Sequence, residues 1–138
     1  ILGYSNKVHD GFLGHSYIGE WVNIGAGTNN SNLKNNYSLV KVQFKNTLLD
    51  TKLKFLGSLI GDYTRISIGT NLNTGSYLGL GVNIFNHDFS KKYVPSFSWG
   101  INDKVKIELL IETIIKMKKR RSCKLTLAEK ELISYLYK

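Results

Sequence analysis

The chain has 138 residues, of which 42% are hydrophobic and 21% charged, and it carries a formal net charge of +9 at pH 7. This composition is typical of a folded globular protein and excludes a disordered or low-complexity chain. No apolar stretch is long enough to span a bilayer and no signal peptide is recognised, so we expect no membrane association and a cytoplasmic location. The single cysteine, Cys123, cannot form an internal disulfide, which agrees with that expectation.

Aliphatic residues recur at every sixth position through much of the chain. This spacing joins Leu2 to Val8, Ile18 to Ile24, and then Ile60, Ile66, Leu72, Leu78 and Ile84. A period of six fits neither an α-helix nor an alternating strand. It predicts a triangular parallel β-helix in which each hexapeptide forms one side and points its aliphatic residue inward. Several stacked coils are required, because each coil buries its inner face only against its neighbours.

The hexapeptide pattern lapses between residues 34 and 56. Apolar residues there alternate with lysines and a glutamine over residues 40–45, and with lysines again over residues 52–55. We predict two strands of a hairpin that turn within residues 46–51 and project as an excursion from one corner of the solenoid. After the last hexapeptide, an exit loop of about residues 85–100 contains the single proline.

Residues 101–138 are predicted to form two amphipathic helices. The first starts near Asp103, a plausible N-cap, and repeats apolar residues at spacings of three and four as far as Met117. The second follows Thr126, which forms a capping box with Glu129. Its expected buried residues are Leu127, Leu132, Ile133 and Leu136. These helices would cap the end or flank of the β-helix, so the predicted fold is mainly β with two C-terminal α-helices.

Six lysines and arginines crowd residues 116–124, at the end of the first predicted helix. A basic stretch raises nucleic acid as a partner, but no nucleic-acid-binding motif accompanies this one. Basic side chains also complement the dipole at a helix C-terminus. We therefore expect a solvated helix end, with attraction of an anionic cofactor or substrate as the alternative, and no nucleic-acid partner.

The segment from Val8 to Asn32 resembles a known acetyltransferase domain, most clearly in its core Val22-Asn-Ile-Gly-Ala-Gly-Thr28. That domain belongs to the bifunctional N-acetylglucosamine-1-phosphate uridyltransferase/glucosamine-1-phosphate acetyltransferase family. The coil at Ile60-Gly-Asp62 and the segment Pro95-Ser-Phe-Ser-Trp-Gly100 are similar to a subgroup of sugar nucleotidyltransferases that carry the same type of β-helix. The resemblance covers nearly the whole chain and implies that the β-helix is left-handed.

The resemblance also implies a domain organisation. Residues 1–100 would form the acyltransferase-like β-helix and residues 101–138 its helical cap. An N-terminal nucleotidyltransferase domain of α/β type, using Mg²⁺, would precede them. Because the chain starts at Ile1 inside a repeat, we expect this domain to be missing from it.

The implied reaction moves an acetyl group from acetyl-CoA to the amine of an amino-sugar 1-phosphate such as glucosamine 1-phosphate, in a protein that also has uridyltransferase activity toward UDP-N-acetylglucosamine. Such chemistry needs a base for the amine, donors for the thioester oxyanion and groups that hold the sugar phosphate. The match places His9 on the catalytic histidine, a residue type that changes protonation near neutral pH. His15 and His87 are its rivals. The spacing of the three histidines predicts no metal site.

Five further residues match binding positions of the family. Asn23 matches a sugar contact, Asn32 a position near the acetyl group, and Lys34 loosely a lysine that contacts phosphate. Ala26 and Thr70 match positions on the acyl-CoA side. The alternatives are structural: the asparagines would cap turns, and Ala26 and Thr70 would fill small corner positions.

The acceptor sugar and the function itself both stay open. Phe12 stands where the family has a sugar-binding tyrosine, which favours a different acceptor sugar. The alternative function is a non-catalytic oligomerisation and regulatory module for a sugar-phosphate nucleotidyltransferase. In either case a homotrimer is expected, with Tyr17, Trp21 and Tyr77 exposed on flat sides that pack around a three-fold axis.

Overall fold

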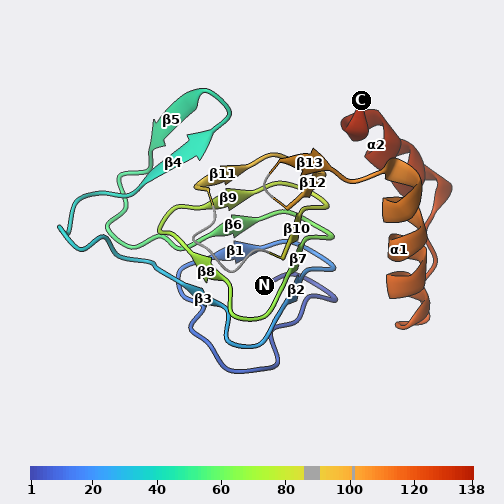
Figure 1. The fold of residues 1–138 in the computed structure, drawn as a ribbon, viewed down its shortest axis with the longest axis horizontal. Helices are drawn as coiled ribbons and strands as arrows, with labels where there is room; N and C mark the ends of the chain where they lie inside the picture. The colour runs from blue at the N-terminus through green and yellow to red at the C-terminus, as the bar shows by residue number, and fades with distance from the viewer. Residues whose placement is uncertain (86–90, 101) are drawn as a thin grey trace.

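The computed structural model describes residues 1–85, 91–100 and 102–138. The chain winds as a left-handed parallel β-helix with short strands on three sides, stacked in successive coils (Figure 1). The first side consists of β1 (Tyr17–Ile18), β6 (Leu59–Ile60), β9 (Tyr77–Leu78) and β11 (Tyr93–Val94). The second side consists of β2 (Asn23–Ile24), β7 (Arg65–Ile66), β10 (Asn83–Ile84), β12 (Ser98–Trp99) and β13 (Asp103–Lys104). The third side includes β3 (Asn29–Asn30) and β8 (Asn71–Leu72), so the predicted fold class is confirmed.

The interior of the prism is a stack of aliphatic side chains. Ile60 pairs with Leu78 on the next coil, so three hexapeptides make one turn. The buried stack consists of Ile18, Val22, Ile24, Ile60, Ile66, Leu72, Leu78, Val82, Ile84 and Val94. Burying each of these side chains contributes about 1.5–3 kcal/mol, which makes the stack the main stabilising element of the solenoid.

The first coil departs from the predicted register. Asn6 pairs with Asn23, so the next inward position falls at Lys7, and Val8 is 75% exposed. Leu13, six residues after Lys7, packs against the buried stack. The inward position predicted at Val8 is therefore wrong by one residue.

Two helices, α1 (Ile107–Lys119) and α2 (Leu127–Tyr137), lie beside the prism (Figure 1). The N-cap of α1 is Lys106, and the predicted N-cap Asp103 is wrong, because Asp103 belongs to β13 and pairs with Trp99. Among the described residues, no helix is long and apolar enough to cross a membrane.

The second helix follows its capping prediction but not its predicted buried face. The capping box between Thr126 and Glu129 is present in full, and Ile133 is buried. The other three residues that were expected to be buried are exposed: Leu127 by 72%, Leu132 by 57% and Leu136 by 50%. Their assignment is wrong because α2 meets the rest of the molecule mainly through Ile133 and Tyr137.

Aromatic residues line the corner between the first and second sides on successive coils. Trp21, Tyr63 and Phe97 have φ angles of 59°, 58° and 66°, in the left-handed region that such residues rarely adopt. In the fourth coil, between those of Tyr63 and Phe97, Gly81 takes this place, where a Cβ atom would meet Leu110 of α1 at 3.2 Å. The aromatic side chains and the helices form a second hydrophobic cluster outside the prism. Trp21 is consequently 4% exposed, and its predicted role on an exposed side is wrong.

The excursion contains the hairpin of β4 (Lys41–Phe44) and β5 (Thr47–Asp50). The first strand agrees with the prediction, but the second comes earlier, because the turn closes at Lys45 and Asn46. Lys45 has a φ of 51°, which suits a tight turn. The hairpin folds back on the first side of the prism, where the Phe44 ring meets Tyr77 and Tyr93 edge-on at 5.2 and 6.0 Å.

Candidate functional site

Three predicted site residues gather at the corner between the second and third sides. Gly27 N donates to Asp10 O at 3.1 Å, and Gly69 N donates to Ala26 O at 2.8 Å, so three successive turns stack there. His9 precedes the lowest turn and is exposed, and Ala26 lies half-buried in the middle one. His9, Ala26 and Thr70 thus belong to three successive turns of this corner, although the register places Ile68, and not Thr70, over Ala26.

The uppermost of these residues offers little side-chain surface. Thr70 is fully buried, and its hydroxyl donates to Ser67 O at 3.0 Å. A contact between this turn and an acyl donor would therefore have to come from the backbone, from the half-buried Ser67 or from Ile68, which is 63% exposed.

Asn32 lies at a different corner, between the third and first sides. Its Nδ2 atom is 2.8 Å from Nδ1 of His15, and the Phe55 ring stacks on that imidazole at 5.3 Å. The ring of Phe12 closes over Gly14 beside Asn32. Within one chain, therefore, Asn32 pairs with the rival His15 and not with His9.

Lys34 lies at the start of the excursion. Its Nζ donates to Leu39 O at 2.9 Å, and it lines a polar hollow of about 460 Å³ together with Asn73 and Lys92. Burial, and then the charge of Lys34, lower the pKa of Lys92. The hollow therefore collects two positive charges, which suits an anion.

Asn23 faces a cleft of about 480 Å³ between the second side of the prism and the end of α1. Its polar lining comes from two asparagines of the coils and three arginines: Asn6, Asn23, Arg65, Arg120 and Arg121. The rings of Tyr4 and Trp21 stack at its edge with centroids 4.1 Å apart. None of the described residues that line the cleft is acidic.

Arg65 is the least satisfied group in this cleft. It projects from β7, half-buried, and burial lowers the pKa of its guanidinium. Its Nε atom is fully buried and has no hydrogen-bond partner among the described residues. The neighbouring Nδ2 atom of Asn83 on β10 is in the same state. Buried donors without partners are rare in folded proteins and call for an explanation.

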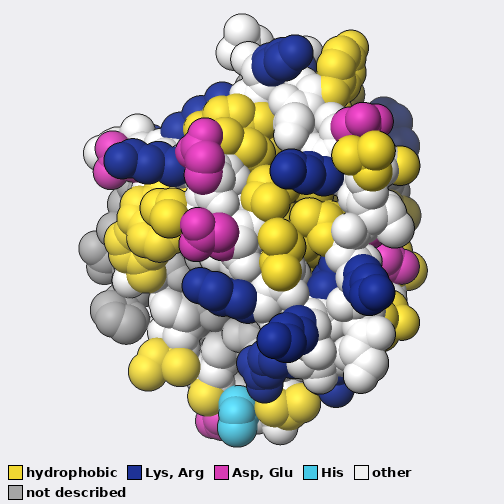
Figure 2. All heavy atoms as spheres, turned by 90° about the vertical axis from the view of Figure 1, so that its right-hand side faces the viewer, with side chains coloured by type: hydrophobic (Ala, Val, Ile, Leu, Met, Phe, Trp, Pro, Cys, Tyr) yellow, Lys and Arg dark blue, Asp and Glu magenta, His cyan; other side chains and the backbone are white. Residues whose placement is uncertain are grey.

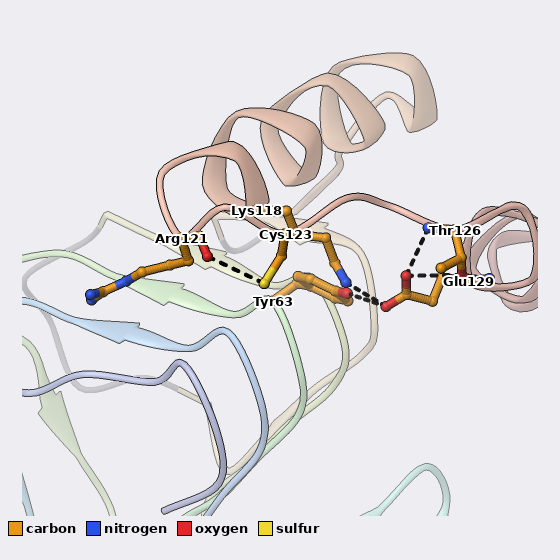
Figure 3. Close-up of polar contacts among 6 residues, drawn as sticks. All are labelled: Tyr63, Lys118, Arg121, Cys123, Thr126 and Glu129. Atoms are coloured by element: carbon orange, nitrogen blue, oxygen red, sulfur yellow. Dashed lines mark hydrogen bonds and ion pairs between the residues drawn. The ribbon is translucent and has the colours of Figure 1, made fainter.

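The end of α1 is held over the cleft by a polar cluster (Figure 3). Lys118 Nζ donates to Glu129 Oε1 at 2.6 Å and lies 5.1 Å from the centroid of the Trp21 ring. The Tyr63 hydroxyl donates to the same carboxylate oxygen at 3.4 Å, and Thr126 N donates to the other at 2.9 Å. The hydrogen bond from Lys118 is the largest cause that lowers the pKa of Glu129 to about 2.

This cluster determines where the basic end of the helix points. In Figure 3 the Arg121 side chain runs away from the Lys118–Glu129 pair and along the coils of the β-helix. Figure 2, seen from the helix side, shows Lys and Arg side chains gathered in the lower half of that face. Part of the basic stretch therefore points at the cleft. The sequence alone did not show where these side chains point.

One predicted residue and one unpredicted residue stand apart from the assignments above. His87 lies outside the described residues. Arg65 was not predicted, although it holds the same outward hexapeptide position as Asn23 and Asn83, one residue before an inward aliphatic. Among the described residues, no group of three or more His, Cys, Asp or Glu residues could hold a metal ion.

No protein-family model matches the chain. It is similar to a bifunctional sugar-1-phosphate nucleotidylyltransferase/acetyltransferase of Sulfurisphaera tokodaii, with 34% identity over 85 residues. The matched segment is 62% of this chain and 21% of that protein, so the chain spans about a fifth of its relative.

Proposed function

We propose that this chain is the acetyltransferase-type β-helix of a sugar-nucleotide enzyme. It would transfer an acetyl group from acetyl-CoA to the amine of an amino-sugar 1-phosphate. The observation that carries the proposal is the 34% identity, over 85 residues of a chain that forms a hexapeptide β-helix, to a relative whose name joins sugar-1-phosphate nucleotidylyltransferase and acetyltransferase. In the whole protein a nucleotidyltransferase domain that uses Mg²⁺ would act on the product, to give UDP-N-acetylglucosamine or a related sugar nucleotide.

His9 is the proposed general base. It is exposed at a corner where the neighbouring turn presents Ala26 and Gly27 with little side-chain bulk, so an acyl donor has room to lie along the stack. Neutral imidazole would take a proton from the sugar amine as that nitrogen attacks the thioester carbon, and CoA thiolate would leave.

The site is proposed to form between neighbouring copies in a homotrimer. His9 and Asn32 lie at different corners of one prism, so a single chain does not bring them together. A second copy placed against the third side would carry its Asn32 corner toward the His9 corner of the first. Shared sites of this kind make activity depend on assembly.

A second candidate function is a non-catalytic oligomerisation and regulatory module. The observation that favours it is the state of Thr70, whose hydroxyl is buried and bonded inside its own turn. Phe12, which offers no hydroxyl to a sugar, points the same way. This alternative predicts that acetyl-CoA does not bind.

A pair of histidine variants tests the catalytic assignment. In the whole protein, with acetyl-CoA and glucosamine 1-phosphate, His9→Ala should lower acetyl transfer by about 10²- to 10⁴-fold, the usual contribution of a general base. His15→Ala is the matched control and should lower it far less. Equal activity of His9→Ala and the parent protein would show that the base lies elsewhere.

A further inference from the structure

We propose that the cleft between the second side of the β-helix and the end of α1 is a phosphate-binding site, in which Arg65, Arg120 and Arg121 hold the phosphate of a small polar ligand. Sugar phosphates are the class that fits best. The site does not depend on acetyl transfer, and its binding can be measured without acetyl-CoA.

The charge of the cleft is the first argument. Arg65 comes from β7, whereas Arg120 and Arg121 follow α1 some 55 residues later, so the fold and not the local sequence brings them together. No acidic residue accompanies them among the described lining residues. Three guanidinium groups in one cleft repel one another. A bound anion attracts all three and so offsets that repulsion. Guanidinium is also the group best matched to phosphate, because it donates two parallel hydrogen bonds.

The unsatisfied donor of Arg65 is the second argument, and it is independent of the first. Its Nε atom is shielded from water yet meets no acceptor in the described part of the chain. A charged group desolvated in this way is costly unless a partner is supplied. Nε itself is closed to solvent, so an oxyanion in the cleft would pair with the remaining guanidinium nitrogens of this half-buried side chain and offset part of that desolvation cost.

The remaining lining indicates what carries the phosphate. The cleft volume of about 480 Å³ lies in the range of small-molecule sites. Asn6 and Asn23 present amides that can donate to and accept from hydroxyl groups, and Tyr4 offers a half-exposed ring against which a sugar can pack. A phosphorylated sugar combines these features, whereas an apolar ligand would leave the amides and arginines unpaired.

The proposal is tested by isothermal titration calorimetry of ligand binding to this chain at low salt. The probes are inorganic phosphate, glucosamine 1-phosphate, CoA, and glucosamine as the ligand without phosphate. We expect the phosphate ligands to bind, glucosamine to bind much more weakly, and affinity to fall as NaCl is added. Tighter binding of glucosamine 1-phosphate than of CoA would identify the sugar phosphate as the source of the phosphate, and the reverse order would identify the nucleotide.

Arginine variants locate the binding. Arg65→Gln and Arg121→Gln should each weaken the binding of glucosamine 1-phosphate roughly tenfold or more, the usual loss when a charged hydrogen bond to phosphate is removed. Lys119→Gln is the matched control, because Lys119 lies on the same helix end but lines a different groove. Arg65→Lys keeps the charge without the paired donors and should bind with intermediate affinity.

Melting curves separate loss of binding from loss of folding. In phosphate-free buffer Arg65→Gln should melt no lower than the parent chain, because it removes an unpaired buried charge. Added phosphate should raise the melting temperature of the parent chain more than that of the variant. Absence of binding by every phosphate ligand, or equal affinities for Arg65→Gln, Arg121→Gln and Lys119→Gln, would overturn the proposal. Equal affinities of the three variants would leave the proposed acetyl transfer untouched, whereas absence of all phosphate binding would also count against it.

Discussion

At the scale of single residues, Lys118 and Glu129 connect the helices to the β-helix and should make stability depend on pH. The pKa of Glu129 falls from 4.5 to about 2 in the folded chain. A carboxyl whose pKa is lowered by folding contributes stability that is complete above its unfolded value and is lost as it becomes protonated. The melting temperature should therefore fall as the pH drops from about 4.5 toward 2, and Glu129→Gln should flatten that dependence.

The same variant should also lose stability at neutral pH. Lys118 is 6% exposed, so removing its partner leaves a buried charge. Because the Glu129 side chain is 36% exposed, water offsets part of this loss, and we expect roughly 1–3 kcal/mol by urea unfolding. Glu112→Gln is the control, since its pair with Lys116 is 4.0 Å long and exposed. Equal unfolding midpoints for the two variants would contradict the role given to Glu129.

Residue patterns predicted the interior well and the site poorly. Inward positions such as Ile60 and Leu78 repeat because each must contact its equivalent on the next coil, so spacing alone identifies them. Val8 is an exception: the spacing from Leu13 to Ile18 is one residue short, but the match of Leu2 with Val8 obscured the inward position at Lys7. Arg65 and Arg121 become neighbours only through the docking of α1, which depends on contacts far apart in the sequence.

At the scale of elements, the hairpin of β4 and β5 should depend on one aromatic contact with the prism. Phe44 is 38% exposed, but its ring meets Tyr77 and Tyr93 edge-on. Phe44→Ala should destabilise the hairpin by about 1–2 kcal/mol and increase amide exchange over residues 41–50. Leu48→Ala, on the far strand and 56% exposed, is the control. Unchanged exchange in Phe44→Ala would mean that the hairpin is held by other contacts.

The two helices are expected to stabilise the solenoid. Ending the chain after Gly100 would uncover Trp21 and Phe97, now 4% and 2% exposed. The apolar area lost is worth several kcal/mol, so the melting temperature should fall by roughly 10 °C or more and solubility should drop. Tyr135→Ala, a change on the exposed face of α2, should leave the melting temperature unchanged. A truncated chain as stable as the whole one would show that the helices serve ligand binding alone.

Helix positions were predictable, but their packing was not. The capping box at Thr126 and Glu129 is a local signal and appears as predicted. The start of α1 was placed too early because β13 competes for Asp103, a contact that no local pattern reveals. Leu127 and Leu136 fit an apolar face by spacing, yet the surface against which α2 packs is too small to bury them.

At the scale of the whole molecule, we expect a trimer. With Trp21 covered by the helices, the described apolar side chains still exposed on the coils include Tyr17, Ile68 and Trp99 at 54%, 63% and 44%. Light scattering on the whole protein should give three times the mass of one chain at micromolar concentration. A monomer under those conditions would remove the shared site proposed between His9 and Asn32.

The central claim is acetyl transfer, and a single assay tests it most directly. The whole protein is mixed with acetyl-CoA and a panel of amino-sugar 1-phosphates, and release of the CoA thiol is followed. We expect release that requires both an amino sugar and its phosphate, with N-acetylated sugar phosphate formed in equal amount. If acetyl-CoA neither binds nor reacts with any member of the panel, the claim is contradicted, and the β-helix is the oligomerisation module instead.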